Sequence, residues 1–162
     1  MLAASEGVCL SGISTFYRTP ALSPPSGEDA TSLPPDPGAY PDFLNGAVEI
    51  RTSLDEGEMV ELLGRIEEAL GRIRLPDKYA PRTMDMDLLL YLPEDSAATP
   101  REAHPDVLTR PWVALPLLEL DPELRLPPEH RPLAEVAASF TDPGGKEEAA
   151  LTGDLRDRFL PC

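Results

Sequence analysis

Two aspartates and three arginines form the most distinctive chemical pattern in this sequence. Asp85 and Asp87 are separated by a single apolar residue, and the chain just before them carries Arg72, Arg74 and Arg82. Arginine binds phosphate oxygens through a planar fork of N–H donors. Carboxylates bind Mg²⁺, which in turn bridges phosphate groups. The pattern predicts a site for a metal-bound nucleotide; the alternative is two solvated aspartates paired with nearby arginines.

A strand is predicted to carry the two aspartates. Residues 85–91 are apolar apart from the aspartates and are rich in leucine. Because side chains alternate across a strand, Asp85 and Asp87 would point to one face, about 6.6–7 Å apart along the backbone. The side chains expected on the other face are Met84, Met86, Leu88 and Leu90.

The clearest helix is predicted to begin at Ser53. Ser53 and Glu56 form a capping-box pattern, and apolar residues then recur at helical spacing. Gly71 follows the last of them and suits the position just beyond a helix end. The apolar positions are Met59, Leu62, Leu63, Ile66 and Leu70.

The other predicted elements are shorter. Residues 11–18 include apolar and β-branched side chains and lead into Pro20, and residues 47–52 alternate apolar with polar side chains, so both favour strands. Residues 21–41 are rich in proline, a composition that cannot fill a core and predicts a loop insert. Helical pieces are predicted at 112–120, 132–139 and 146–159.

Length and charge restrict the class of protein. The chain has 162 residues, with 29 acidic against 14 basic side chains and a net charge of −15. This length favours a single domain over residues 1–162, with 21–41 as an insert and 140–162 as a C-terminal extension. The negative charge argues against nucleic-acid and membrane partners. The sequence has neither a membrane-spanning apolar run nor a secretory signal, so we expect a cytoplasmic protein.

Six ordered sequence blocks surround these candidate residues. They are Phe16-Tyr17-Arg18-Thr19-Pro20, Asp42-Phe43-Leu44-Asn45, Arg65-Ile66-Glu67, Gly71-Arg72-Ile73-Arg74, Pro81-Arg82-Thr83-Met84-Asp85-Met86-Asp87, and His104-Pro105 with Arg110 and Pro116-Leu117. Their order, and their spacing outside the proline-rich insert, resemble the hydroxymethyldihydropterin pyrophosphokinase family over roughly residues 8 to 125.

The resemblance implies a fold and an activity. The fold would be α+β, a ferredoxin-like antiparallel sheet with helices packed on it. The activity would be transfer of pyrophosphate from ATP to 6-hydroxymethyl-7,8-dihydropterin, giving AMP and the pterin diphosphate in folate biosynthesis. Such a transfer needs positioning and charge neutralisation rather than a covalent enzyme intermediate.

The resemblance also implies which residues would act on ATP. Asp85 and Asp87 would bind two Mg²⁺ ions, consistent with two-metal catalysis of an in-line displacement. The residues implied to catalyse are Arg72, Arg74, Arg82, Asp85 and Asp87. Those implied to contact ATP are Glu67, Arg82, Leu88, His104 and Arg110.

The pterin would lie between two aromatic rings, Phe43 and Trp112, with the Asn45 amide reading its pyrimidine edge. Stacking on such rings contributes about 0.5–1.5 kcal/mol beyond area burial. Groups around Thr19, Pro20 and Leu22 would complete the pocket by the same resemblance.

The beginning of the chain departs from the family. Members begin with a strand ending in a Gly-Ser-Asn turn and then a long helix, whereas residues 1–7 resemble only the end of that helix. We therefore expect an N-terminally incomplete sheet, whose central slot is filled by a segment upstream of Met1 or by a second copy of the chain. The family implies a monomer, and self-association is expected if the first strand is absent.

Two other functions fit part of the pattern. A non-catalytic descendant could keep the fold as a binding or scaffolding protein, but no structural role requires the set of Arg82, Asp85, Asp87 and His104. A different metal-dependent enzyme, such as a nucleotidyl transferase or glycosyltransferase, could use the two aspartates, but Phe43, Asn45 and Trp112 at family positions argue against it.

Overall fold

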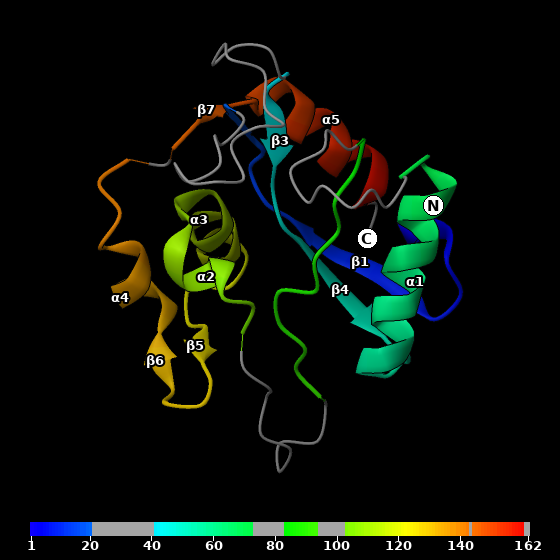
Figure 1. Ribbon diagram of the computed structural model, residues 1–162, viewed down its shortest axis with the longest axis horizontal. Helices are drawn as coiled ribbons and strands as arrows, with labels where there is room; N and C mark the ends of the chain where they lie inside the picture. The colour runs from blue at the N-terminus through cyan, green and yellow to red at the C-terminus, as the bar shows by residue number, and fades with distance from the viewer. Residues whose placement is uncertain (21–40, 73–82, 94–102, 143, 161–162) are drawn as a thin grey trace, which may run out of the picture.

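The computed structural model describes residues 1–20, 41–72, 83–93, 103–142 and 144–160 and combines helices with antiparallel strands (Figure 1). The strands are β1 (Val8–Ile13), β2 (Tyr17–Thr19), β3 (Phe43–Asn45), β4 (Val48–Thr52), β5 (Arg125–Leu126), β6 (Arg131–Pro132) and β7 (Lys146–Glu147). The helices are the 3₁₀ turn η1 (Leu2–Ala4), α1 (Glu56–Ala69), α2 (Asp106–Thr109), α3 (Pro111–Leu120), α4 (Leu133–Ala137) and α5 (Ala149–Phe159). The expected mixture of helices and antiparallel strands is confirmed.

Strand β2 is the middle strand of a three-stranded sheet. It pairs with β3 on one edge and with β7, from the C-terminal part of the chain, on the other. Strand β1 pairs antiparallel with β4, and β5 with β6. The C-terminal segment is therefore built into the same sheet as the beginning of the chain.

The prediction of one continuous strand at residues 11–18 is wrong, because β1 and β2 are separated at residues 14–16. The side chain of Ser14 is buried, and its Oγ accepts a hydrogen bond from the Ala47 N–H at 2.8 Å. The Phe16 N–H donates to Thr152 Oγ1 at 3.0 Å. Because side chains accept from the backbone N–H groups of Phe16 in the break and of Ala47 just before β4, the strand can stop here without leaving these donors unpaired.

Helix α1 begins later than predicted. Its N-cap is Asp55, whose carboxylate accepts a hydrogen bond from the Glu58 N–H at 2.9 Å, while the Glu58 carboxylate accepts one from the Asp55 N–H at 2.8 Å. The predicted capping box of Ser53 and Glu56 is therefore wrong, since an Asp-x-x-Glu pair two residues later fills that role. The helix end agrees with the prediction: Gly71 follows it with φ +87°, a conformation that favours glycine.

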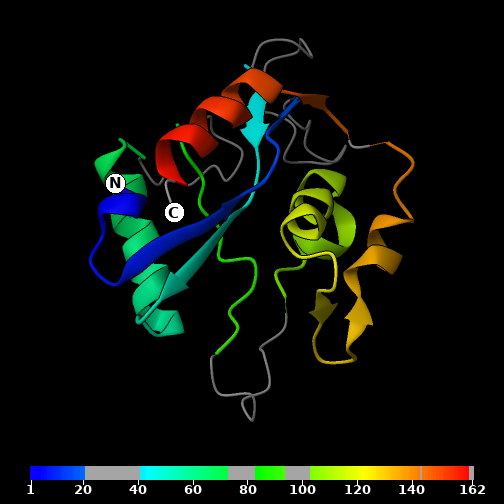
Figure 2. The same ribbon diagram turned by 180° about the vertical axis from the view of Figure 1, so that it is seen from behind.

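Two apolar clusters lie on opposite sides of residues 83–93 (Figures 1 and 2). One consists of Met59, Leu62, Leu63 and Ile66 of α1 with Val8 of β1 and Ile50 of β4. The other consists of Val107, Ala114, Leu124, Leu126, Leu133 and Val136, from α2, α3, β5, α4 and the chain beside β5. The segment contributes Met86 and Leu88 to the first cluster, and Leu89 and Leu90 to the second.

The prediction of a strand at residues 85–91 is wrong, because no strand is assigned there. A strand needs a repeated ladder to a neighbour. Backbone groups of this segment pair singly instead: the Met86 N–H donates to the Glu67 carboxylate at 2.7 Å, and the Leu89 carbonyl accepts from the His104 N–H at 2.9 Å. The predicted alternation of faces ends at Leu90, which packs with the same cluster as Leu89.

The predicted helices in the second half of the chain are confirmed in outline. Helix α3 spans Pro111–Leu120, with proline at its first position, where the missing N–H costs no intrahelical bond. Helix α4 is shorter than predicted, at Leu133–Ala137. The tail at residues 146–159 divides into β7 and α5. Within the described parts of the chain, no helix combines the length and apolar character needed to cross a membrane.

Candidate active site

Glu67 connects the end of α1 to the segment that carries the two aspartates. It is only 4% exposed, and its carboxylate accepts hydrogen bonds from the Arg72 guanidinium and from the Met86 N–H. The same Arg72 guanidinium lies 2.7 Å from Asp85 Oδ1. The pKa of Arg72 is raised: its partial burial lowers the pKa, but Asp85 and Glu67 together outweigh that effect. Glu67 and Asp85 therefore hold a charged arginine beside the aspartate pair.

Asp87 lies in a cluster of negative charge. Its pKa is raised, first by burial and then by the neighbouring charge of Asp85, with smaller contributions from Asp106 and Glu67, while His104 acts in the opposite direction. Carboxylates held close to like charges favour the binding of a cation. Mg²⁺ binds through one or two carboxylates and completes its shell with phosphate and water oxygens, so this pair has the chemistry that the ion requires. In the part of the chain described, no cluster of three or more histidine, cysteine or acidic side chains forms a complete protein cage for a metal.

His104 and Arg110 flank the short helix α2. The Asp106 N–H donates to His104 Nδ1 at 3.3 Å, so Nδ1 is the acceptor and Nε2 is the ring nitrogen that can donate to a ligand. Arg110 Nε lies 3.1 Å from Asp106 Oδ1, one helical turn away. Asp106 therefore orients both residues, and both could donate to phosphate oxygens.

Three residues predicted to bind the pterin lie together on β2 and β3. Thr19 pairs directly with Phe43, and Tyr17 with Asn45, so by strand alternation Thr19, Phe43 and Asn45 share one face. Asn45 Nδ2 donates to Thr19 Oγ1 at 2.8 Å. The second N–H and the carbonyl oxygen of this amide can still read a ligand edge. Phe43 is 40% exposed, as a ring that stacks on a ligand requires.

Trp112 lies in the first turn of α3. Its ring packs against Gly144, and the next residue, Gly145, packs against β2 of the same sheet. A Cβ placed on Gly144 would lie 2.7 Å from Trp112 Cε3, and a Cβ placed on Gly145 would lie 2.8 Å from Thr19 Cγ2. The two glycines therefore pass between the Trp112 ring and β2.

The remaining predicted residues have different outcomes. Leu88 packs its side chain against the α1 cluster, so only its backbone could face a nucleotide. Pro20 lies at the exposed end of β2. Three predicted site residues fall outside the part of the chain that the structure describes: Arg74, Arg82 and Leu22.

Two features of the site were missed at the sequence level. Asp106 stands four residues before Arg110, a spacing that signals a helical ion pair. Gly144 and Gly145 form a dipeptide typical of a tight turn, but no local pattern indicates that this turn would meet Trp112.

The family model described as 7,8-dihydro-6-hydroxymethylpterin-pyrophosphokinase (HPPK) matches residues 2–122. The chain is 36% identical over 126 residues to a 2-amino-4-hydroxy-6-hydroxymethyldihydropteridine pyrophosphokinase of Synechocystis sp., a match that covers 75% of this chain and 55% of that relative. It is 33% identical over 115 residues to the protein of that name from Haemophilus influenzae, covering 68% of this chain and 69% of the relative. Over 150 residues it is 33% identical to the one from Methylorubrum extorquens, covering 90% and 82%.

The chain thus spans little more than half the length of the Synechocystis relative. The family match covers the whole region from β1 to α3, including the aspartate pair and the aromatic residues. The chain belongs to the 7,8-dihydro-6-hydroxymethylpterin-pyrophosphokinase family.

Proposed function

We propose that this protein transfers the terminal pyrophosphate of ATP to the hydroxymethyl oxygen of 6-hydroxymethyl-7,8-dihydropterin. The observation that carries the proposal is the contact of Arg72 with both Glu67 and Asp85, in a chain of this family. The second aspartate, Asp87, interacts electrostatically with Asp85 and His104. The names of its relatives support the same reaction.

Asp85 and Asp87 would hold Mg²⁺, as two ions in the family pattern. The ions would supply positive charge that binds the phosphates and lowers the cost of the charge developing on them. The protein's own cations would also stabilise the phosphates. They are Arg72 from the end of α1 and Arg110 beside α2, and the Nε2–H of His104 would add a hydrogen-bond donor. We assign Arg74 and Arg82 to the same phosphate contacts by the family pattern.

The pterin would lie against the face of β2 and β3 that carries Phe43 and Asn45. The exposed Phe43 ring offers a stacking surface, and Trp112 is proposed as the opposite ring. The Asn45 amide keeps one donor and one acceptor for the pyrimidine edge after its bond to Thr19.

Three broader assignments accompany this reaction. The antiparallel β1–β4 pair with α1 packed beside it supports the ferredoxin-like arrangement. One domain would contain the catalytic residues, an insert at 21–41 and an extension at 140–162. The need for ATP favours action in the cytoplasm.

Steady-state kinetics of Asp85→Asn and Asp87→Asn test the proposal. Each should lower kcat by about 10²–10³-fold or more, because each removes charge that stabilises the transferring phosphates. The matched control is Asp154→Asn, a change of the same type at an exposed position of α5, which should keep wild-type turnover. Near-native activity of either site variant at saturating Mg²⁺ and ATP would show that the metal assignment is wrong.

A further inference from the structure

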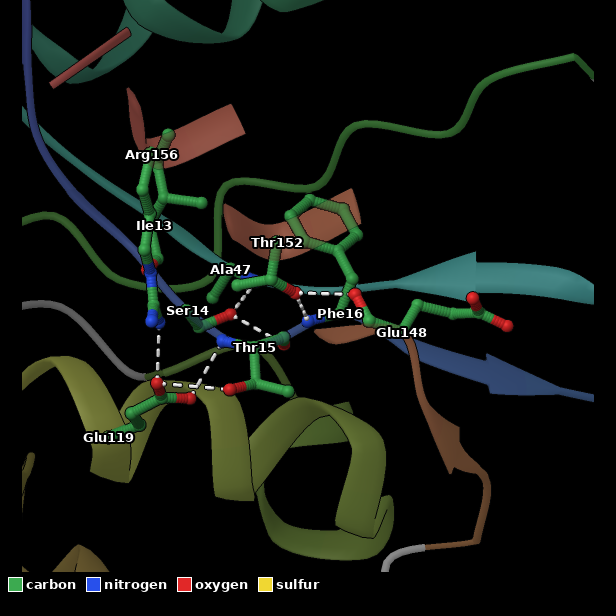
Figure 3. A network of polar contacts seen from close by, with 9 residues as sticks. All are labelled: Ile13, Ser14, Thr15, Phe16, Ala47, Glu119, Glu148, Thr152 and Arg156. Atoms are coloured by element: carbon green, nitrogen blue, oxygen red, sulfur yellow. Dashed lines mark hydrogen bonds and ion pairs between the residues drawn. The ribbon is translucent and has the colours of Figure 1, made fainter. Parts of the chain in front are cut away.

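The chain beyond the region matched by the family model contacts the predicted pterin side of the candidate site. Residues 144–159 include β7 and α5, and they lie after residue 122, where the family match ends. We call residues 144–156 the C-terminal clamp. Figure 3 shows its main polar contacts with the connection between β1 and β2.

The first group of contacts joins three elements at one carboxylate. Glu119 of α3 accepts hydrogen bonds from the Thr15 N–H at 2.7 Å and the Thr15 hydroxyl at 3.1 Å. Arg156 of α5 donates to the same carboxylate at 2.6 Å and to the Ile13 carbonyl at 2.8 Å. Burial raises the pKa of Glu119, but the Thr15 and Arg156 donors outweigh it, so the pKa is lowered. The clamp thus fixes α3 against the end of β1.

The second group of contacts holds the beginning of β2. The Phe16 N–H donates to Thr152 Oγ1 at 3.0 Å, and the Phe16 carbonyl accepts from the Glu148 N–H at 2.8 Å (Figure 3). Both backbone groups of Phe16 are therefore satisfied by the clamp. A partly exposed ion pair between Arg18 and Glu148, 2.6 Å apart, adds a weak contact.

The glycine turn at the start of the clamp fits tightly against the substrate side of the site. Gly144 has φ +75°, and a Cβ there would meet the Trp112 ring at 2.7 Å. A Cβ on Gly145 would lie 2.7 Å from the Arg18 carbonyl oxygen and 2.8 Å from Thr19 Cγ2. Real Cβ atoms almost never approach so closely, so only glycine lets the turn sit between Trp112 and β2 without displacement.

We propose that the C-terminal clamp positions the pterin pocket, with the Gly144–Gly145 turn setting the separation between Trp112 and the β2–β3 face. This inference rests on the proposed function. Trp112 and Thr19, which the turn contacts, are both assigned to the pterin, whereas Asp85 and Asp87 lie on a separate segment, residues 83–93. The clamp should therefore affect pterin binding far more than ATP binding.

The test is Gly145→Ala, compared with Gly153→Ala as the matched control. Gly153 lies in α5 of the same C-terminal region, and a Cβ there would meet nothing within 4 Å. Trp112 is the single tryptophan of the chain, so its fluorescence reports directly on the pocket. We expect Gly145→Ala to shift Trp112 emission in the ligand-free protein and to raise the Kd for hydroxymethyldihydropterin about tenfold or more. The Kd for an ATP analogue with Mg²⁺ should change less than twofold, and Gly153→Ala should match the wild type in all three measurements.

A second variant acts from a distance and keeps the turn intact. Arg156→Ala removes the contacts to Glu119 and Ile13, and it should weaken pterin binding in the same selective way, with partial rescue in Arg156→Lys. The clamp proposal would be overturned if Gly145→Ala and Arg156→Ala bound the pterin as tightly as the wild type. It would also be overturned if both variants lost pterin and nucleotide affinity equally. Either result would leave the proposed function intact. A wild-type protein that binds the nucleotide but not the pterin would overturn both.

Discussion

Replacing Glu67 with alanine removes the carboxylate that ties the end of α1 to the segment carrying the aspartates. Glu67 is 4% exposed and accepts hydrogen bonds from the Met86 N–H at 2.7 Å and from the Arg72 guanidinium. Alanine leaves both donors without this acceptor, and α1 loses its polar connection to Met86.

The size of the loss follows from the exposure of the two donors. The half-buried Met86 N–H loses a charged acceptor, which costs about 1–3 kcal/mol. Arg72 keeps its contact with Asp85 and is one fifth exposed, so its lost pair contributes about 0.5–1 kcal/mol. We expect Glu67→Ala to lower the free energy of unfolding by about 1.5–4 kcal/mol. Glu67→Gln keeps an oxygen for Met86 and should lose about half as much.

Urea denaturation followed by circular dichroism measures these differences. The matched control is Glu68→Ala, the neighbouring glutamate on the exposed side of α1, whose effect should stay within about 0.5 kcal/mol. A Glu67→Ala variant as stable as Glu68→Ala would refute the argument that Glu67 joins the helix to the aspartate segment.

Three further predictions concern stability. The raised pKa of Asp87 means that its ionised form opposes folding at neutral pH. Asp87→Asn should therefore increase the free energy of unfolding at pH 7, by a small amount because solvent screens this exposed carboxylate. In thermal melts the gain should vanish as the pH falls below the usual aspartate range, and a gain that persists there would contradict the prediction. The lowered pKa of Glu119 means that its ionised form stabilises the fold, so Glu119→Gln should be less stable than the wild type at pH 7. The difference in free energy of unfolding should shrink as acid protonates the wild-type carboxylate, and a difference that grows in acid would contradict this prediction. Tyr91 donates its hydroxyl to the Leu54 carbonyl at 3.1 Å, so Tyr91→Phe should cost about 0.5–1.5 kcal/mol in urea denaturation, and an unchanged midpoint would argue against this bond.

The elements that the sequence predicted correctly are those with long periodic patterns. Helix α1 repeats its apolar residues over several turns, and Gly71 marks its end, so its existence and end were predictable. Its start was not, because Ser53 and Asp55 both precede a glutamate by three residues and only the folded chain decides between them. The local sequence alone therefore fits an N-cap at either residue.

The aspartate segment shows the limit of strand prediction. Composition and alternation at residues 85–91 match a strand, but a strand exists only where a neighbour completes its hydrogen-bond ladder. Here the buried Glu67 carboxylate and the His104 backbone supply the partners. These contacts join residues far apart in the sequence, and no local pattern encodes them.

The candidate site was predictable where one element carries neighbouring residues. Phe43 and Asn45 were assigned to the pterin by the family resemblance, with no strand predicted at these residues. Their common face follows from their spacing of two once β3 forms, whereas their pairing with Thr19 is set by the register of β2 and β3, which is a tertiary contact. The approach of Gly144 to Trp112 depends on how β7 pairs with β2, which is a tertiary contact.

The most direct test of the central claim is phosphorus NMR of the products formed from ATP, Mg²⁺ and 6-hydroxymethyl-7,8-dihydropterin by the purified protein. Transfer at the Asp85–Asp87 site predicts AMP and a pterin carrying two coupled phosphorus atoms in equal amounts, with both signals absent in Asp87→Asn. Formation of ADP or free phosphate in place of AMP, or ATP consumption that does not depend on the pterin, would contradict it.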